Sequence, residues 1–389
     1  MFGLFGNKAK KLRILAVDVG TVSISAALAE KTLPDGKYEI KKVLRYFFQL
    51  IDISSKGKDR NEQIMRMFLG GFNKLFADTF KLERHIDEIL ISFSDPFFVE
   101  KRITRGSLRK HPDNPITPEE MAVLIKEMDE EAMEGPKDLA LAGKEMVALR
   151  VNGYSVDSAV GYKGSAMEAS GLFTLISKFL KEYVEDAKEK FFPRSAINYY
   201  SDVRVLWQVL KSTENIFEPA AVIDIGGEMT GVFFVGAVSG AANNTFLPDA
   251  IEHGKPVAFG VRTIERRLAA FLKTDFFEAE AVFKKYTAGT LDEAMRVKVS
   301  KILDSAMEDW WNSLAESLAD FKGKKILITG GGADCDFFSE TIKLNFKKYY
   351  DSDVNVHVLQ AEAFKDSFSP PDMLKGGSDV VLASLMLYS

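Results

Sequence analysis

The stretch AAVIDIGGEMTG, residues 220–231, has the pattern of a phosphate-binding turn between two strands. An apolar strand runs into Asp224, the pair Gly226 and Gly227 follows, and the chain then becomes apolar again. Glycines let backbone N–H groups come close to phosphate oxygens. Glu228 directly follows them, and its carboxylate would repel a bound anion by about 1–4 kcal/mol if it faced the phosphates. The stretch therefore predicts an anion site and raises the question of whether that site is active.

Two further turns of the same kind occur, in ILAVDVGTVSIS at residues 14–25 and in ILITGGGADC at residues 326–335. A single turn of this type is more often a hairpin with a capping aspartate, but three in this order are far more specific. Two facing turns can hold phosphates from both sides, and a glycine triplet before a helix lets a base and ribose lie against backbone. The residues expected to bind a nucleotide are Asp18, Gly20, Thr21, Ser23, Asp224, Gly226, Gly227, Thr230, Gly330, Gly331, Gly332 and Ala333.

Asp18 and Asp224 end their strands, where they would face the metal that accompanies a polyphosphate. Mg²⁺ keeps several of its waters in proteins, so we expect both carboxylates to hold it mainly through water. The sequence thus predicts ATP and Mg²⁺ as ligands.

Composition excludes several other classes of protein. The formal net charge is −5 with no strongly basic block, which argues against a nucleic-acid-binding protein. The chain has one cysteine and four histidines, too few for a disulfide framework or a Cys/His zinc site, and the lone thiol fits a reducing cytoplasm. No apolar run reaches the roughly 18 residues that span a bilayer.

The order of strand and helix patterns indicates a duplicated fold with an insertion. Strand–glycine turn–strand units begin near residues 12 and 222, about 200 residues apart. Between them, residues 95–166 change character, with turn prolines and Thr117 as the expected N-cap of a helix. The expected division is a leader at 1–11, a first lobe at 12–94 and 167–213, an inserted α+β subdomain at 95–166, and a second lobe at 214–389. In the second lobe we expect strands at 222–224, 230–235, 242–247 and 325–329.

The three turns, in this order, resemble the phosphate-1, phosphate-2 and adenosine motifs of the actin-like ATPase superfamily. The insertion resembles the subdomain that the FtsA/PilM branch carries at this place, and residues 152–170, NGYSVDSAVGYKGSAMEAS, resemble the return from it in FtsA. The resemblance covers nearly all of residues 12–388. In AFGVRTIERRLAAFL the residues matching family positions are Gly260 and Thr263, and FFEAEAVFKKY resembles the family's purine-contacting helix through Glu280 and Lys284, the lysine one residue later than the usual spacing.

This resemblance implies a bilobed, duplicated actin-like (ribonuclease H-like) α/β fold with weak ATPase activity. It favours an FtsA-like, ATP-controlled cytoskeletal adaptor or filament protein of cell division, peripheral at the cytoplasmic face of the inner membrane. The alternative is a PilM-like type IV pilus module that binds the cytoplasmic peptide of a membrane partner. The run at 152–170 favours FtsA, whereas FtsA normally continues into a membrane-targeting helix beyond the point where this sequence stops. A small-molecule kinase of the same superfamily fits less well.

Glu228 stands where the family usually has glycine or another small residue. It either points to solvent or to a lysine, or it orders Mg²⁺ or water in a catalytic role. In actin-like ATPases a polar residue in the helix before phosphate-2 positions the attacking water. The matching stretch, YYSDVRVLWQVL at residues 199–210, offers Ser201, Asp202 and Gln208.

The first residues, MFGLFGNKAKKLR, combine an apolar tip with basic residues. Such a segment can enter a membrane interface and contact anionic headgroups, so we expect weak membrane contact there. A disordered leader or packing on the first strand is the alternative. The residues concerned are Phe2, Leu4, Phe5, Lys8, Lys10 and Lys11.

Overall fold

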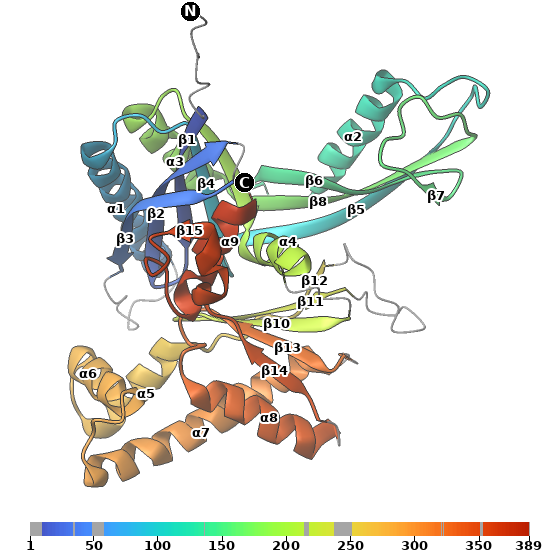
Figure 1. Cartoon of the computed structure of the whole chain (residues 1–389). Helices are drawn as coiled ribbons and strands as arrows, with labels where there is room; N and C mark the ends of the chain where they lie inside the picture. Colours follow the sequence, from blue (N-terminus) through green and yellow to red (C-terminus); the bar gives the residue numbers. More distant parts are fainter. Residues whose placement is uncertain are drawn as a thin grey trace, which may run out of the picture.

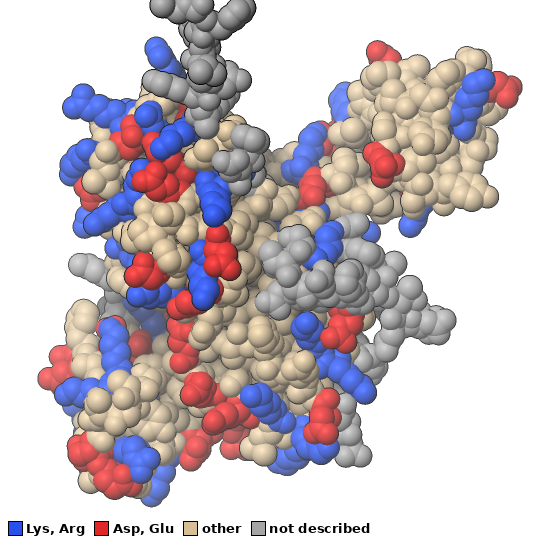
Figure 2. All heavy atoms as spheres, in the orientation of Figure 1, with Lys and Arg blue, Asp and Glu red and all other residues tan. Residues whose placement is uncertain are grey.

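The computed structural model shows two lobes and a subdomain that projects from the first lobe like an arm (Figure 1). It describes residues 10–33, 36–48, 58–135, 137–213, 218–236, 251–319, 321, 323–350 and 353–388. Basic and acidic side chains are interspersed over both lobes on the face shown in Figure 2, which agrees with the absence of a basic block in the sequence. Among the described residues, no helix is long and apolar enough to cross a membrane.

The first lobe is a six-stranded sheet in the order β15-β3-β2-β1-β4-β9. β1 is antiparallel to β2 and parallel to β4, and both β1 and β4 are apolar because helices cover the two faces of the sheet. α1 packs with α3, and α4 packs with α9. The elements are β1 (Lys10–Val19), β2 (Ser23–Leu33), β3 (Tyr38–Phe47), α1 (Lys58–Leu82), β4 (Glu88–Phe93), α3 (Lys178–Phe191), β9 (Ala196–Ser201), α4 (Asp202–Thr213), β15 (Phe368–Ser369) and α9 (Val380–Tyr388).

The second lobe repeats this topology in a five-stranded sheet, β12-β11-β10-β13-β14. β10 is antiparallel to β11 and parallel to β13, as β1 is to β2 and β4. The strand expected at 242–247 lies outside the described residues, and β12 is the third strand here. The elements are β10 (Ala220–Ile225), β11 (Thr230–Val235), β12 (Ile251–His253), α5 (Val261–Leu272), α6 (Phe276–Thr287), α7 (Glu293–Leu318), β13 (Lys325–Thr329), α8 (Asp336–Tyr350) and β14 (Asn355–Val358).

The arm is a four-stranded sheet, β5-β8-β6-β7, covered by α2. Thr117 caps α2 as expected: its hydroxyl accepts from Glu120 N–H, and the Glu120 carboxylate accepts from Thr117 N–H. β8 is paired on both sides by arm strands, so it belongs to the arm, and the boundary expected at residue 166 lies instead near residue 177. The elements are β5 (Phe98–Leu108), α2 (Pro118–Ala132), β6 (Leu139–Val151), β7 (Tyr154–Ser155) and β8 (Ala166–Ser177).

The last segment returns to the first lobe, although we expected residues 214–389 to form the second. β15 pairs with β3, and α9 packs on α4, β1 and β4. α9 is apolar on all sides and buried from Val380 to Met386, so other elements must pack against every side of it. Two short 3₁₀ turns, at Ala361–Ser367 and Gly377–Asp379, lead the chain back.

Candidate nucleotide site and a second cavity

The β1–β2 and β10–β11 turns have the same geometry. Gly20 N–H donates to the Ser23 carbonyl oxygen at 3.0 Å, and Gly226 N–H donates to the Met229 carbonyl oxygen at 2.9 Å. In both turns the closing hydrogen bond therefore starts at the first residue after the central strand of the sheet. The local sequence produces this, because Gly20 and Gly226 each stand two residues after the aspartate.

The two turns touch across the gap between the lobes. Glu228 N–H donates to Thr21 Oγ1 at 3.1 Å. A Cβ atom on Gly227 would lie 2.0 Å from Val22 Cγ1, closer than any real contact. Gly227 must therefore be glycine for the turns to meet, and backbone from both lobes borders one site.

The third turn lies against the end of β10. Gly330 has φ +88°, and a Cβ there would stand 2.2 Å from Asp224 Oδ1, so both its backbone and its surroundings require glycine. Gly332 N–H donates to the Ile225 carbonyl oxygen at 2.8 Å. An added Cβ on Gly331 would meet nothing within 4 Å, which leaves this residue open to the cavity.

A cavity of about 210 Å³ lies between the lobes where these turns meet. Of the residues predicted from the sequence, it is lined by Asp18, Gly20, Thr21, Ser23, Asp224, Gly226, Gly227, Gly330 and Gly331. The structure adds lining residues that we did not predict, chiefly Ser25, Arg45, Ser94, Asp95, Gly377 and Ser378.

Three carboxyl groups line this cavity, those of Asp18, Asp95 and Asp224, and the buried Asp202 lies close to them. Burial, and then the charge of Asp224, raise the pKa of Asp18 to about 7. Burial, and then the charge of Asp95, raise the pKa of Asp224 to about 6, and burial raises that of Asp95 to about 6. Burial and the neighbouring acids Asp224 and Asp95 hold the pKa of Asp202 well above its usual range. Among the residues that the structure describes, one oxygen each of Asp95 and Asp202 has no hydrogen-bond partner.

This acidic cluster suits a cation that keeps its hydration shell. Within the described residues, no group of three or more His, Cys, Asp or Glu side chains is placed to hold a metal ion. Carboxylates that are close together yet unable to converge on one ion can accept hydrogen bonds from the waters of Mg²⁺. Asp18 and Asp224 occupy the positions that the sequence assigned to this task, and whether they bind Mg²⁺ stays a prediction.

Several predicted residues support the site without lining it. Thr230 is fully buried, and its hydroxyl donates to the Phe259 carbonyl oxygen at 2.7 Å and accepts from Trp310 Nε1. Gly260 begins α5 with Thr263 as its N3 residue, and the N–H groups after Gly260 donate to the carbonyl oxygens of the second turn. The N-terminus of helix α5 therefore fixes the backbone of that turn through hydrogen bonds. Gly332 and Ala333 of the third turn likewise lie outside the lining.

The charged residues predicted nearby form ion pairs of their own. Arg266 on α5 binds the Glu228 carboxylate with both guanidinium arms, one at 2.9 Å, and Glu228 does not line the cavity. The expected partner of Glu228 was lysine or solvent, and the structure provides an arginine. On α6, Lys284 pairs with Glu280, and neither residue lines the cavity.

The three candidates for positioning water are separated by the structure. Asp202, the first residue of α4, belongs to the acidic cluster. Burial raises the pKa of Asp224, and the hydrogen bond with Asp202 lowers it by a smaller amount. Ser201 Oγ donates to Glu100 at 2.8 Å, and Gln208 Nε2 donates to Glu145 at 3.4 Å. Ser201 thus lines a different cavity, and Gln208 contacts Glu145, which also lines that cavity.

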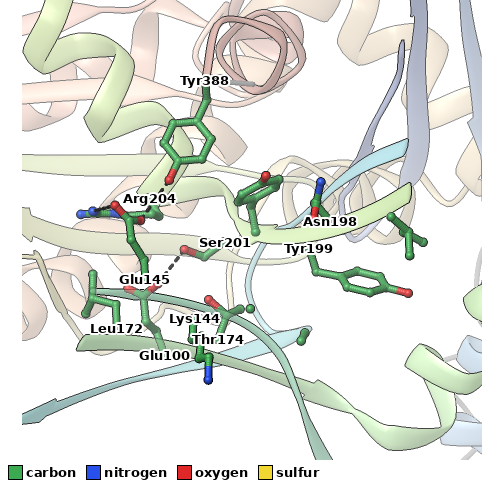
Figure 3. Close-up of a pocket in the computed structure, with 14 residues that line it drawn as sticks. Glu100, Lys144, Glu145, Leu172, Thr174, Asn198, Tyr199, Ser201, Arg204 and Tyr388 are labelled. Atoms are coloured by element: carbon green, nitrogen blue, oxygen red, sulfur yellow. Dashed lines mark hydrogen bonds and ion pairs between the residues drawn. The ribbon is translucent and has the colours of Figure 1, made fainter. Parts of the chain in front are cut away.

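This second cavity, of about 410 Å³, lies between β9 and the sheet of the arm (Figure 3). Glu145 on β6 is held there by Arg204 of α4, with Nε at 2.6 Å from Oε2, and by the Tyr388 hydroxyl at 3.0 Å. Arg204 is 5% exposed, and its buried Nη1 atom has no hydrogen-bond partner within the described part of the chain. Three elements from distant parts of the sequence thus meet at the ion pair of Glu145 and Arg204, two residues that line this cavity.

Strand β9, an edge strand among the described residues, borders the same cavity. β9 is the outer strand of its sheet, with β4 on one side only, and residues 197–201 line the cavity. A Cβ on Gly143 of β6 would stand 2.6 Å from the Tyr199 carbonyl oxygen, so β6 approaches β9 closely at that point. The sequence analysis did not predict this cavity, because it depends on how the arm docks on the first lobe.

The apolar N-terminal residues of the predicted membrane segment, Phe2, Leu4 and Phe5, lie outside the described residues, as does Lys8. Lys10 is the first residue of β1. The Lys11 ammonium pairs with Glu30 at 2.9 Å on β2. Lys11 is therefore engaged by the sheet, and a membrane contact would have to rest on the preceding residues.

The duplicated sheets, the two facing turns and the insertion at this place define the actin-like ATPase fold, which confirms the predicted fold class. Among solved structures, the chain is similar to one in the PilM–PilN type IV pilus biogenesis complex, with 13% identity, 96% of this chain and 97% of that chain covered, and a TM-score of 0.60. It therefore shares the fold of that chain.

Two further structures are similar over nearly the whole chain. The ethanolamine utilization protein EutJ from Carboxydothermus hydrogenoformans is 12% identical, with 98% of this chain and 90% of that chain covered and a TM-score of 0.45. MreB5 of Spiroplasma citri bound to ADP is 8% identical, with 96% and 94% covered and a TM-score of 0.45. No protein-family model and no curated protein matches the sequence.

Proposed function

We propose that this chain is an actin-like nucleotide-binding protein that holds ATP with Mg²⁺ in the cavity between its lobes. The observation that carries the proposal is the contact of the two glycine turns beside the partly buried Asp18 and Asp224. Backbone N–H groups of both turns would bind the phosphates, and the carboxylates would bind the waters of the metal. Asp202 is the residue best placed to orient an attacking water, because it joins these acids from α4. Turnover by such a site is expected to be slow.

Calorimetric titration with ATP and MgCl₂ tests this proposal. The protein is expected to bind ATP, and its melting temperature should rise with ATP concentration, because the ligand binds only the folded state. Asp224→Ala should abolish both effects. Asp113→Ala, at an exposed position on the arm, is the control and should leave both unchanged. A melting temperature unaffected by millimolar ATP in the parent protein would overturn the proposal.

We also propose that the second cavity binds an extended peptide of a partner protein, which makes the chain a PilM-like module rather than an FtsA-like filament protein. Two observations favour this: among the described residues β9 is the outer strand of its sheet, so an added strand can pair with it, and the Arg204 guanidinium at the cavity has a buried Nη1 without a described partner, which can donate to a peptide carbonyl or carboxylate once β9 and the arm admit the peptide. PilM of the similar complex assembles with PilN, and by analogy the partner here would be a membrane protein with a short cytoplasmic segment.

Peptides that represent the cytoplasmic segments of membrane proteins encoded beside this gene provide the test. One of them should bind the parent protein, and Arg204→Gln should weaken it by about tenfold or more, since each lost charge-assisted hydrogen bond costs about 1.5–3 kcal/mol. Arg150→Gln, on the arm but outside this cavity, is the matched control. ATP-dependent filaments seen by electron microscopy, without binding of any such peptide, would favour the FtsA-like alternative.

A further inference from the structure

The charge balance of the cavity between the lobes is unusual for an anion site. Three carboxyl groups line it, those of Asp18, Asp95 and Asp224. Arg45, on β3, is the one lysine or arginine among the described residues that line it. A triphosphate entering this cavity is repelled by the acids, and one divalent ion does not neutralise the whole set of charges. A fixed positive charge that faces the phosphates would offset part of this repulsion.

Strand register places Arg45 in line with the first predicted metal residue. Asp18 on β1 is directly opposite Ser25 on β2, and Ser25 is directly opposite Arg45 on β3. Directly opposite residues in antiparallel strands point to the same face of a sheet, with Cβ atoms about 4.5–5.5 Å apart. The three side chains therefore form one row on the face that borders the cavity, and the long arginine side chain can reach over Ser25 towards Asp18.

Asp379 fixes the direction of this arginine. Arg45 Nη2 donates to Asp379 Oδ1 at 2.6 Å, and Lys375 N–H donates to Asp379 Oδ2 at 2.8 Å. The Asp379 side chain is 1% exposed and that of Arg45 is 37% exposed, so the pair runs from the protein interior to an accessible guanidinium. Within the described residues the pair engages Nη2 alone, which leaves the N–H groups of Nε and Nη1 for a ligand.

We propose that Arg45 is the phosphate-binding side chain of this site and that Asp379 is its positioning residue. The inference rests on the proposed nucleotide binding and adds the group that recognises the polyphosphate. A guanidinium with two adjacent N–H groups matches two phosphate oxygens, and such charge-assisted pairs are about twice as strong as neutral hydrogen bonds. Since no adenine contact is involved, Arg45 should act equally on ATP and on inorganic tripolyphosphate.

The test is a titration of the full chain with ATP and MgCl₂, with inorganic tripolyphosphate as a competitor. Arg45→Ala should raise the dissociation constant for ATP by tenfold or more and that for tripolyphosphate by a similar factor. Arg45→Lys should recover part of the loss, because it keeps the charge and loses the paired N–H groups. Lys42→Ala, at an exposed position on the same strand and outside this cavity, is the control and should bind like the parent.

Arg45→Ala leaves the buried Asp379 without its partner and can unfold the protein. The double variant Arg45→Ala/Asp379→Asn removes that orphaned charge, and it is expected to fold and to show the same loss of affinity. A folded variant without Arg45 that binds ATP like the parent would overturn the inference and leave the proposed function intact. The same holds if ATP is weakened and tripolyphosphate is not. A parent protein that binds neither ligand overturns the proposed function, and this inference with it.

Discussion

Replacing Asp18 by asparagine should stabilise the protein while it abolishes nucleotide binding. In the folded protein, burial and the neighbouring Asp224 raise the pKa of Asp18 from 3.8 to about 7. Between these values the folded state binds more protons than the unfolded state, so the free energy of unfolding rises as the pH falls. Above pH 7 Asp18 is ionised in both states, and the full cost of its raised pKa is subtracted from the free energy of unfolding. At about 1.36 kcal/mol per pKa unit, this penalty is on the order of 4 kcal/mol.

The magnitude of the gain should depend on pH in a defined way. At pH 5.5 the folded protein holds Asp18 mostly protonated, and the remaining penalty is about 2 kcal/mol by the same conversion. Asp18→Asn has no such penalty, and its amide oxygen can still accept the long hydrogen bond from Ser92, which measures 3.4 Å in the parent. The variant should therefore exceed the parent by at most about 4 kcal/mol at pH 8 and by about half as much at pH 5.5.

Urea unfolding of the nucleotide-free proteins at the two pH values measures this difference. Subtracting parent from variant at each pH cancels the contributions of distant titrating groups. Asp113→Asn, an exposed substitution, should change stability by no more than about 0.5 kcal/mol at either pH. If Asp18→Asn is no more stable than the parent at pH 8, or gains equally at both pH values, the reasoning about this buried carboxyl group is wrong.

Three further predictions concern other parts of the chain. Glu228→Gly should leave the dissociation constant for ATP within a few-fold, because Arg266 holds that carboxylate outside the cavity lining; calorimetry would contradict this with a tightening of more than about tenfold. Trp310→Phe should lower the free energy of unfolding in urea by about 1–3 kcal/mol, because it removes a buried indole and its hydrogen bond to Thr230. An unchanged value would mean that the core refills the space. Deleting residues 2–8, which leaves β1 complete, should reduce co-sedimentation with anionic vesicles, and equal sedimentation of both proteins would exclude the predicted membrane contact.

Local signals explain what was predictable from the sequence. β11 and β13 have the bounds expected for them, because each is a short apolar run followed by a glycine. Asp18 and Asp224 end their strands as expected, since an aspartate followed by a glycine turn specifies the local backbone regardless of its surroundings. The duplicated topology then follows from the repeated strand order.

What was missed depends on long-range packing. Arg45 became part of the site through the register of three strands and an ion pair with Asp379, 334 residues further along the chain. The arm boundary depends on which strands β8 pairs with, and the position of α9 depends on the apolar surface of the first lobe that it covers. Asp95 did carry a usable signal, because it closely follows a strand parallel to β1, and the carboxyl ends of parallel strands meet at one edge of a sheet.

The return of the last segment to the first lobe has a consequence for biosynthesis. The second lobe is contiguous, from 218 to 358, so all of its strands have been synthesised before α9 is translated. The first lobe is assembled from three separate stretches, and the surfaces of β1 and β4 that α9 covers stay exposed until the final helix leaves the ribosome. Contacts that join such distant stretches close slowly, and the uncovered apolar surface is prone to aggregation meanwhile. Of the two lobes, the one that is begun first is therefore the one whose core is completed last.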